Sequence, residues 1–199
     1  MDAKKIRDIK SRKTANDKIY TPPEVAQLMI NMCEIKEGQS VLDPSKGGGV
    51  FYDCFPNYCI KDYCEIDENK DFFNYNNNVD IIIGNPPYSL ITKWLDHTLK
   101  ICNKFCYILG AMNFTVSRLR KISNAGFGLT KIHLVKVNWW FCTSFIGVFE
   151  KNKDSIITIS AFEILCEYCN NRKCKRGRQG NPPNICTIIP FNQSLLSSP

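Results

Sequence analysis

The sequence has no long hydrophobic run, no export signal and very little histidine. No stretch of roughly 18 or more apolar residues occurs among its 199 residues, so nothing in it predicts a membrane span. Residues 1–13, MDAKKIRDIKSRK, lack the apolar core of a signal peptide, and we therefore expect a cytoplasmic protein. The chain also lacks GxGxxG and Walker A loops, which excludes the two commonest phosphate-binding signatures.

Positive charge and cysteine are plentiful. The formal net charge is +7, with six basic side chains in residues 4–13 and five in residues 172–178. These clusters favour a polyanionic partner, and solvated basic termini are the alternative. Without an export signal the eleven cysteines are expected to be reduced, and the first seven to serve as small core residues.

The last four cysteines leave two interpretations open. Cys166, Cys169, Cys174 and Cys186 have a spacing that a four-thiolate zinc site can use. A second close CxxC pair is missing, so free thiols on a basic tail are the alternative, and no metal ligand is assigned.

The stretch NVDIIIGNPPYS, residues 78–89, predicts a buried strand that ends in a rigid turn. Its apolar run, with three consecutive isoleucines, is typical of a central parallel strand. Two prolines then end the strand because neither has an N–H to donate. Open α/β sheets bind ligands at the carboxyl ends of such strands. The second NPP, at residues 181–183, has neither a strand before it nor an aromatic residue after it.

A glycine-rich loop follows an earlier predicted strand. In QSVLDPSKGGGVFYDCF, Asp43 ends a short strand, and three glycines precede an aromatic helical turn. Glycines allow a close approach of the backbone to a ligand, which favours a cofactor loop over a flexible turn. Glu65 lies 22 residues after Asp43, near the end of the strand predicted at 61–66. Acidic residues at such positions bind ribose hydroxyls in nucleotide sites.

The remaining pattern alternates between helix and strand. Thr21 is predicted as an N-cap with Pro22 at the first helical position, and Gly38 as the end of that helix. Helices are predicted at 91–102 and 116–126, and strands at 104–112 and 129–137. Runs at 138–150 and 155–162, separated by KNKD, predict a hairpin. The result is an α/β fold with a mostly parallel sheet and an antiparallel C-terminal edge hairpin.

In this order the motifs resemble one known family. The chain is similar to the class I S-adenosylmethionine-dependent amino-methyltransferases, especially small phage-type or solitary DNA adenine-N6 methyltransferases. NPPY at 85–88 matches their [DNS]PP[YF] turn, and DPSKGGGVF at 43–51 matches their DPxxGxGxF loop. The resemblance covers about residues 19–160 and implies a single-domain, Rossmann-like class I methyltransferase fold. A phage or viral origin is left open.

The resemblance also implies the domain limits and the site. Residues 1–18 are a basic N-terminal arm, 19–165 the catalytic domain and 166–199 a Cys-rich basic appendage. The implied catalytic residues are Asn85, Pro86, Pro87 and Tyr88. The implied S-adenosylmethionine-binding residues are Thr21, Pro22, Asp43, Pro44, Gly47, Gly49, Phe51, Glu65, Asp71 and Phe72.

The implied reaction moves a methyl group in line from the sulfonium to N6 of an adenine flipped out of double-stranded DNA. The Asn85 side-chain oxygen and the Pro86 carbonyl would accept hydrogen bonds from the amino group, and Tyr88 would stack on the base. This chemistry requires neither a metal nor a strong base, which agrees with a chain that holds only two histidines.

Three departures from the family pattern matter. Lys46 and Gly48 add charge and flexibility to the cofactor loop. Only five residues separate Glu65 from Asp71, so the usual intervening helix cannot fit and the cofactor's adenine pocket is expected to differ. About forty residues follow the region of resemblance, which ends near residue 160. They are too few for an ordinary recognition domain, which makes a separate recognition subunit a predicted partner.

Alternatives with the same fold are an rRNA N-methyltransferase and a protein glutamine-N5 methyltransferase, whose motif is also NPPY. The basic ends favour nucleic acid over protein. Cytosine-N4 enzymes more often begin the motif with serine. A non-catalytic methyltransferase-like subunit is the alternative of a different class.

Overall fold

The computed structural model describes residues 20–138, 140, 142–157, 162–166 and 186–190. The chain divides into two units, Met1–Ile157 and Thr158–Pro199. In the second unit, β7 (Phe162–Cys166) and β8 (Cys186–Pro190) form an antiparallel pair in which Cys166 lies opposite Cys186. No helix in the described ranges is long and apolar enough to cross a membrane.

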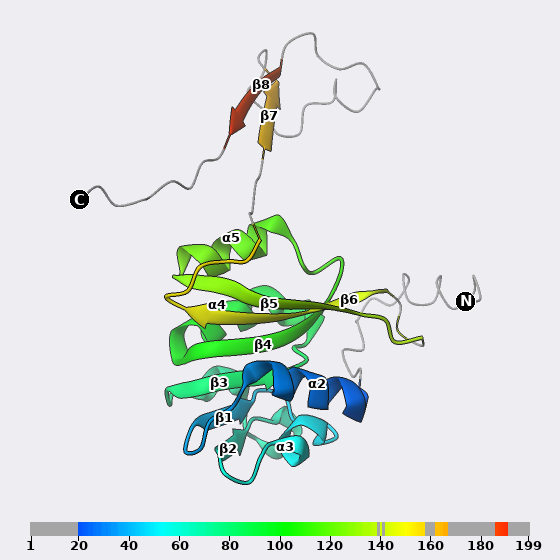
Figure 1. Cartoon of the computed structure of the whole chain (residues 1–199), viewed down its shortest axis with the longest axis vertical. Coiled ribbons are helices and arrows are strands. Elements are labelled where there is room, and N and C mark those ends of the chain that lie inside the picture. Colours follow the sequence, from blue (N-terminus) through cyan, green and yellow to red (C-terminus); the bar gives the residue numbers. More distant parts are fainter. Residues whose placement is uncertain (1–19, 139, 141, 158–161, 167–185, 191–199) are drawn as a thin grey trace. The chain divides into compact units, whose positions relative to one another are not determined.

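The first unit is a six-stranded sheet with helices packed on it (Figure 1). The strand order is β2-β1-β3-β4-β6-β5. The strands are β1 (Ser40–Asp43), β2 (Ile60–Tyr63), β3 (Val79–Gly84), β4 (Cys102–Gly110), β5 (Phe127–Val135) and β6 (Ser144–Lys151). The first four pair in parallel, and β6 is antiparallel to both β4 and β5. The predicted mostly parallel sheet with an antiparallel edge pair is confirmed.

The partner of β6 differs from the predicted one. We expected residues 138–150 to pair with 155–162, but β6 pairs along its length with β5. The segment after β6 crosses β5 instead: the Ile156 amide donates to the Leu129 carbonyl at 2.9 Å. Gly128 permits this crossing, because a Cβ there would lie 2.1 Å from the Lys153 carbonyl oxygen. β5 prevails as partner because its nine residues bring the buried Phe127 and Leu129 into the core.

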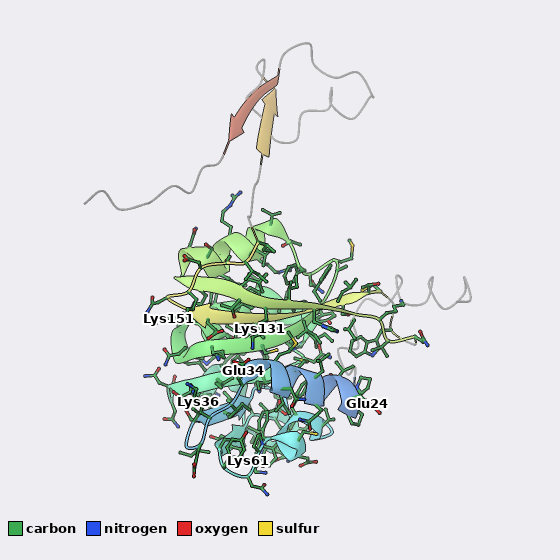
Figure 2. All side chains as sticks on the ribbon, in the orientation of Figure 1. Glu24, Glu34, Lys36, Lys61, Lys131 and Lys151 are labelled. Atoms are coloured by element: carbon green, nitrogen blue, oxygen red, sulfur yellow. The ribbon has the colours of Figure 1, made fainter. Side chains whose placement is uncertain are left out.

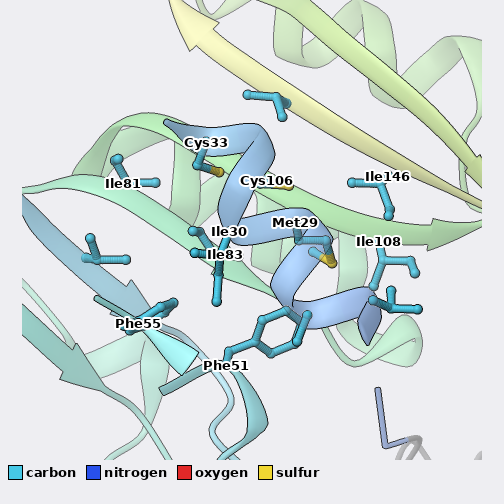
Figure 3. Close-up of a cluster of buried hydrophobic side chains, with 14 of the residues drawn as sticks. Met29, Ile30, Cys33, Phe51, Phe55, Ile81, Ile83, Cys106, Ile108 and Ile146 are labelled. Carbon is cyan, nitrogen blue, oxygen red and sulfur yellow. The ribbon is translucent and has the colours of Figure 1, made fainter. Parts of the chain in front are cut away.

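Both faces of the sheet are covered. Ile81 and Ile83 of β3 belong to a buried cluster with residues of α2 (Pro23–Cys33) and α3 (Val50–Cys54) (Figure 3). Because successive strand residues point to opposite faces, Ile82 is buried on the other side. That face is covered by α4 (Ile91–Ile101), whose Thr98 hydroxyl is 2.7 Å from the Tyr107 hydroxyl. α5 (Val116–Asn124) packs beside α4 and contacts β5.

The first helix starts later than predicted. α2 begins at Pro23 with Pro22 as its N-cap, and no side chain caps it. The N-cap predicted at Thr21 is therefore wrong. Proline already holds the extended φ of an N-cap position, and the Thr21 hydroxyl accepts instead from the Asn85 side-chain amide at 3.4 Å.

The same helix also ends earlier than predicted, at Cys33 rather than near Gly38. Glu34 terminates it in the left-handed conformation, with φ of 51°. Two lysines of the sheet bond to its last carbonyls: Lys131 Nζ lies 3.0 Å from the Met32 oxygen, and Lys104 Nζ 3.1 Å from the Cys33 oxygen. Lys131 also pairs with Glu34 at 2.6 Å, and Figure 2 shows the two side chains together. The helix has no basic residue in its own last turn, so the sheet supplies the cations.

We expect Lys104→Met to lower the free energy of unfolding by about 1 kcal/mol, because a charged donor at the helix C-terminus is lost together with the 3.2 Å ion pair of Lys104 with Glu150. Urea denaturation followed by circular dichroism measures the change. Lys93→Met, at an exposed position in the first turn of α4, is the matched control and should not destabilise. An equal loss in both variants would show that the helix terminus is not the cause.

Candidate active site

A cavity of about 550 Å³ lies at the carboxyl ends of β1 and β3. Its walls come from the chain before α2 and from the loops that follow β1, β2 and β3. Nine of the predicted site residues line it: Thr21, Pro44, Gly47, Phe51, Glu65, Asp71, Phe72, Asn85 and Pro87. They meet because the parallel strands β2, β1 and β3 are neighbours and end at the same edge.

The other five predicted residues do not line the cavity. Pro22 caps α2, and Gly49 caps α3 with φ of 85°. Pro86 directly follows the lining residue Asn85, Asp43 directly precedes the lining residue Pro44, and both are buried. Tyr88, half-buried, begins a short 3-10 helix, η3 (Tyr88–Leu90), and its hydroxyl bonds to the backbone of β4.

Glu65 ties together two loops of the cavity. Its Oε2 accepts from the Gly47 amide at 2.6 Å, and its Oε1 accepts from the Asp67 amide at 3.2 Å. Each carboxylate oxygen has two lone pairs, so these bonds leave acceptor capacity for a ligand hydroxyl. Two short 3-10 turns, η1 (Ile66–Glu68) and η2 (Phe72–Asn74), follow. The predicted absence of an intervening α-helix is confirmed.

Asp43 is fully buried at the end of β1. Its Oδ1 accepts from the Ser45 amide at 3.1 Å, and Oδ2 has no hydrogen-bond partner in the described part of the chain. Burial raises the pKa of Asp43 to about 7, against the opposing effect of the Ser45 amide. Asp43 therefore holds the loop after β1 in place through its contact with the Ser45 amide. Gly84 is needed beside it, since a Cβ there would lie 2.9 Å from Pro44 Cδ.

Asn85 is oriented by contacts from two other loops. Its Nδ2 donates to Thr21 Oγ1 at 3.4 Å, which directs Oδ1 away from Thr21. The Ser45 hydroxyl donates to the Asn85 backbone carbonyl at 3.3 Å. A residue that follows β3 is thus held against the chain before α2 and the loop after β1.

An aromatic wall closes one side of the cavity. Phe72 packs on Trp94 of α4 with ring centroids 4.4 Å apart and on the edge of His97 at 4.8 Å. The His97 Nε2 lies 2.9 Å from the Tyr75 carbonyl oxygen. Trp94 was not predicted as a site residue, because a tryptophan at helical spacing beside other apolar residues is typical of the hydrophobic core. Its place in the site depends on how α4 packs.

Lys46 and Glu68 connect the glycine loop to the acidic loop at the cavity edge. Their side chains form an ion pair of 3.1 Å, and Tyr63 donates its hydroxyl to Glu68 at 2.8 Å. Lys46 lies 4.1 Å from the Tyr63 ring centroid and Lys70 lies 3.7 Å from it. No sequence motif identified these residues, since charged side chains in loops most often face solvent.

Other candidates for the site fall elsewhere. Trp140, an aromatic residue between β5 and β6, is buried in the hydrophobic cluster that contains residues of α2, and residues 139 and 141 lie outside the described residues. Cys169 and Cys174, which a four-thiolate site would need, lie outside them too. In the described ranges no group of three or more His, Cys, Asp or Glu is placed to hold a metal.

Comparisons with known proteins bear on the fold and on the first part of the chain. The model of a family described as N-6 DNA Methylase matches residues 7–72, which include the glycine loop and Glu65 but not the Asn85 turn. No curated protein sequence matches the chain.

Three solved structures share the fold. The 23S rRNA methyltransferase ErmE is 13% identical, with a TM-score of 0.55 over 71% of this chain and 72% of its own. The magnesium protoporphyrin IX methyltransferase ChlM of Synechocystis PCC 6803, solved with bound SAM, is 10% identical, with a TM-score of 0.53 over 64% and 76%. A modification subunit assigned to a type I restriction enzyme of Vibrio vulnificus YJ016 is 14% identical, with a TM-score of 0.50 over 83% and 51%. This chain therefore spans about half the length of that subunit.

The first unit thus has the Rossmann-like fold of class I methyltransferases. The cofactor that this fold and the family match imply is S-adenosylmethionine.

Proposed function

We propose that this chain, which resembles N-6 DNA methylases over residues 7–72, methylates the N6 amino group of adenine in DNA with S-adenosylmethionine as methyl donor. The observation that carries the proposal is the position of Asn85. The Asn-Pro-Pro-Tyr turn begins at the edge of a cavity that the glycine loop, Glu65 and Asp71 also line. A cofactor site and an amide acceptor therefore adjoin each other.

The residues present fit the cofactor. A cavity of about 550 Å³ is within the ordinary range for ligand pockets of about 300–1,000 Å³. Four carboxylates and two lysines line the cavity: Glu65, Asp67, Glu68 and Asp71, with Lys46 and Lys70. This excess of negative charge suits a sulfonium cation. S-adenosylmethionine supplies an activated methyl group when it is bound.

Each part of the cavity has a proposed role in holding that cofactor. Glu65 accepts hydrogen bonds from the ribose hydroxyls, and Asp71 with Phe72 holds the adenine against the aromatic wall. Gly47 and its neighbours let the backbone approach the ligand closely. Thr21 lies at the methionine end.

Asn85 and Pro86 make the target nitrogen a better nucleophile. The lone pair of adenine N6 is delocalised into the ring, and two acceptors aimed at its hydrogens localise that pair on nitrogen. Asn85 Oδ1 is one acceptor and the Pro86 carbonyl the other. The fixed φ of proline holds the carbonyl without reorganisation. Tyr88 stacks on the base once it has left the duplex.

The charge distribution indicates where DNA is held. Residues 20–157 contain fourteen basic and fourteen acidic side chains, so the net charge of +7 lies entirely in residues 1–19 and 158–199. The methyltransferase fold is itself electroneutral. Non-specific attraction to a polyanion is therefore assigned to the terminal segments.

Replacing Arg172, Lys173, Lys175, Arg176 and Arg178 by glutamine should weaken DNA binding at low salt by about tenfold or more, and flatten the dependence of affinity on salt. Fluorescence anisotropy at several salt concentrations measures both. The matched control replaces Lys93, Lys100, Lys136, Lys151 and Lys153, five exposed lysines of the first unit. An equal loss in the control would contradict the assignment to the terminal segments.

A transfer assay tests the proposed activity. The full chain is incubated with methyl-labelled S-adenosylmethionine and separate DNA, RNA and protein fractions, and the modified product is identified by mass. We expect N6-methyladenine in DNA. Label in RNA or on protein glutamine would replace the substrate assignment. Cofactor binding without transfer to any fraction would indicate a non-catalytic subunit that works with a separate recognition partner.

A further inference from the structure

The Tyr88 hydroxyl makes two hydrogen bonds to the end of a neighbouring strand. It accepts from the Gly110 amide at 3.0 Å and donates to the Ile108 carbonyl at 3.4 Å. Both backbone groups belong to β4, whereas Tyr88 follows β3 by four residues. The aromatic residue of the turn is therefore attached to the sheet by its polar end.

The sheet topology explains why these two groups are available. Pairing of β3 with β4 stops at Gly84 and Tyr107, while pairing of β4 with β6 continues to Gly110 and Ser144. Backbone groups of alternate strand residues face opposite neighbours. The Ala111 amide donates toward β6, to the Thr143 carbonyl at 3.0 Å, so Ile108 and Gly110 face the side where β3 has already ended. The Tyr88 hydroxyl thus bonds to the backbone groups of β4 that a further residue of β3 would have paired with.

Gly110 is closely packed beside this contact. A Cβ at this position would lie 3.0 Å from Cys142 Sγ and 3.6 Å from Tyr88 Cε2. Its backbone φ is not in the left-handed region, so backbone strain is not the reason for glycine. The effect of a larger residue would be steric: a methyl group here would press on Cys142, which must move by a few tenths of an ångström, and would touch the Tyr88 ring at ordinary van der Waals distance.

We propose that Gly110 and the Tyr88 hydroxyl form a positioning device that holds the Tyr88 ring in place before the substrate arrives. Gly110 is a positioning residue, since it acts through Tyr88. A ring ordered in advance loses less side-chain entropy when a base stacks on it, so binding of the flipped base is tighter. The stacking part rests on the proposed function, whereas the attachment of the ring to β4 does not.

The attachment is tested by amide hydrogen exchange of the full chain. In Tyr88→Phe the Gly110 amide should exchange about five to ten times faster, because it loses its acceptor. Tyr58→Phe is the matched control, since the Tyr58 hydroxyl also donates to a backbone carbonyl, that of Ile35, at 3.3 Å. An unchanged Gly110 rate in Tyr88→Phe would overturn the attachment. This result is independent of any methyltransferase activity.

The positioning role is tested with DNA that carries 2-aminopurine at the target position. Tyr88→Phe keeps the ring but should raise the KM for DNA about three- to tenfold, with a smaller change in kcat and unchanged cofactor affinity. Gly110→Ala should have the same effect, and the double variant should be no worse than either single variant. Additive losses, or wild-type KM and 2-aminopurine fluorescence in Tyr88→Phe, would overturn the positioning role.

The two tests separate the possible failures. If no DNA is methylated but the Gly110 amide still depends on the Tyr88 hydroxyl, the proposed function fails and the attachment stands. If Gly110→Ala does not fold, Tyr88→Phe alone decides both tests, because it adds no atoms to the packed interior.

Discussion

Asn85→Ala should lower turnover by about two to three orders of magnitude, comparable to deleting one preorganised electrostatic partner of a transition state. The side-chain oxygen that localises the lone pair of the target nitrogen is removed. The contact of Nδ2 with Thr21 orients the Asn85 side chain. Single-turnover methyl transfer at saturating cofactor measures the loss at the chemical step.

The chain provides its own control for this experiment. Asn181 begins the second Asn-Pro-Pro sequence, which follows no apolar run. Asn181→Ala should leave the rate unchanged. Cofactor affinity, measured by calorimetry, should survive in Asn85→Ala, since Asn85 contributes one side chain to a cavity with many others. Turnover near the wild-type rate in Asn85→Ala would refute the assigned role.

Asp43 should make the protein less stable as the pH rises from about 4 to about 7. Burial raises its native pKa from the ordinary 3.8 to about 7. In this window the unfolded chain has released the proton and the native state retains it, so unfolding becomes easier as pH rises. The stabilising contribution of protonated Asp43 is fully present below about pH 4. It is lost by about pH 7 and does not change further above that pH. A shift of this size corresponds to about 4 kcal/mol.

Asp43→Asn isolates this effect because asparagine does not ionise. The stability of the variant relative to the wild type should rise by about 4 kcal/mol between pH 4 and pH 8, measured by urea denaturation at each pH. Ser45→Ala is the control: it keeps the backbone amide that bonds Asp43 Oδ1, so the pH dependence should remain. A pH-independent difference between wild type and Asp43→Asn would show that Asp43 is ionised in the native state throughout.

Local sequence patterns were sufficient to predict the architecture, because the elements of the sheet can be recognised from a few neighbouring residues. The isoleucine run of β3 places apolar side chains on both faces of the strand. It therefore predicts a central, buried strand whichever strands are its neighbours. Where two local signals competed, sequence reasoning failed. Thr21 satisfied the rule for an N-cap, but the adjacent proline took that position and left the hydroxyl to Asn85. The hairpin rule favoured residues 155–162, but the longer apolar strand β5 paired with β6.

The sequence by itself determined the order of the elements and the chemical types brought to one end of the sheet. Strand periodicity, glycine and proline positions and the Asn-Pro-Pro-Tyr turn are local properties, and they act over a few residues.

Only the tertiary structure decided which of these residues meet and how each is held. Trp94 joins the cavity wall through the packing of α4, the sheet lysines bond to the end of α2, and Tyr88 is fixed where β3 stops short of β4. These contacts join residues far apart in the chain, and their geometry depends on strand lengths and register. No local pattern encodes how far one strand extends beyond the end of its neighbour.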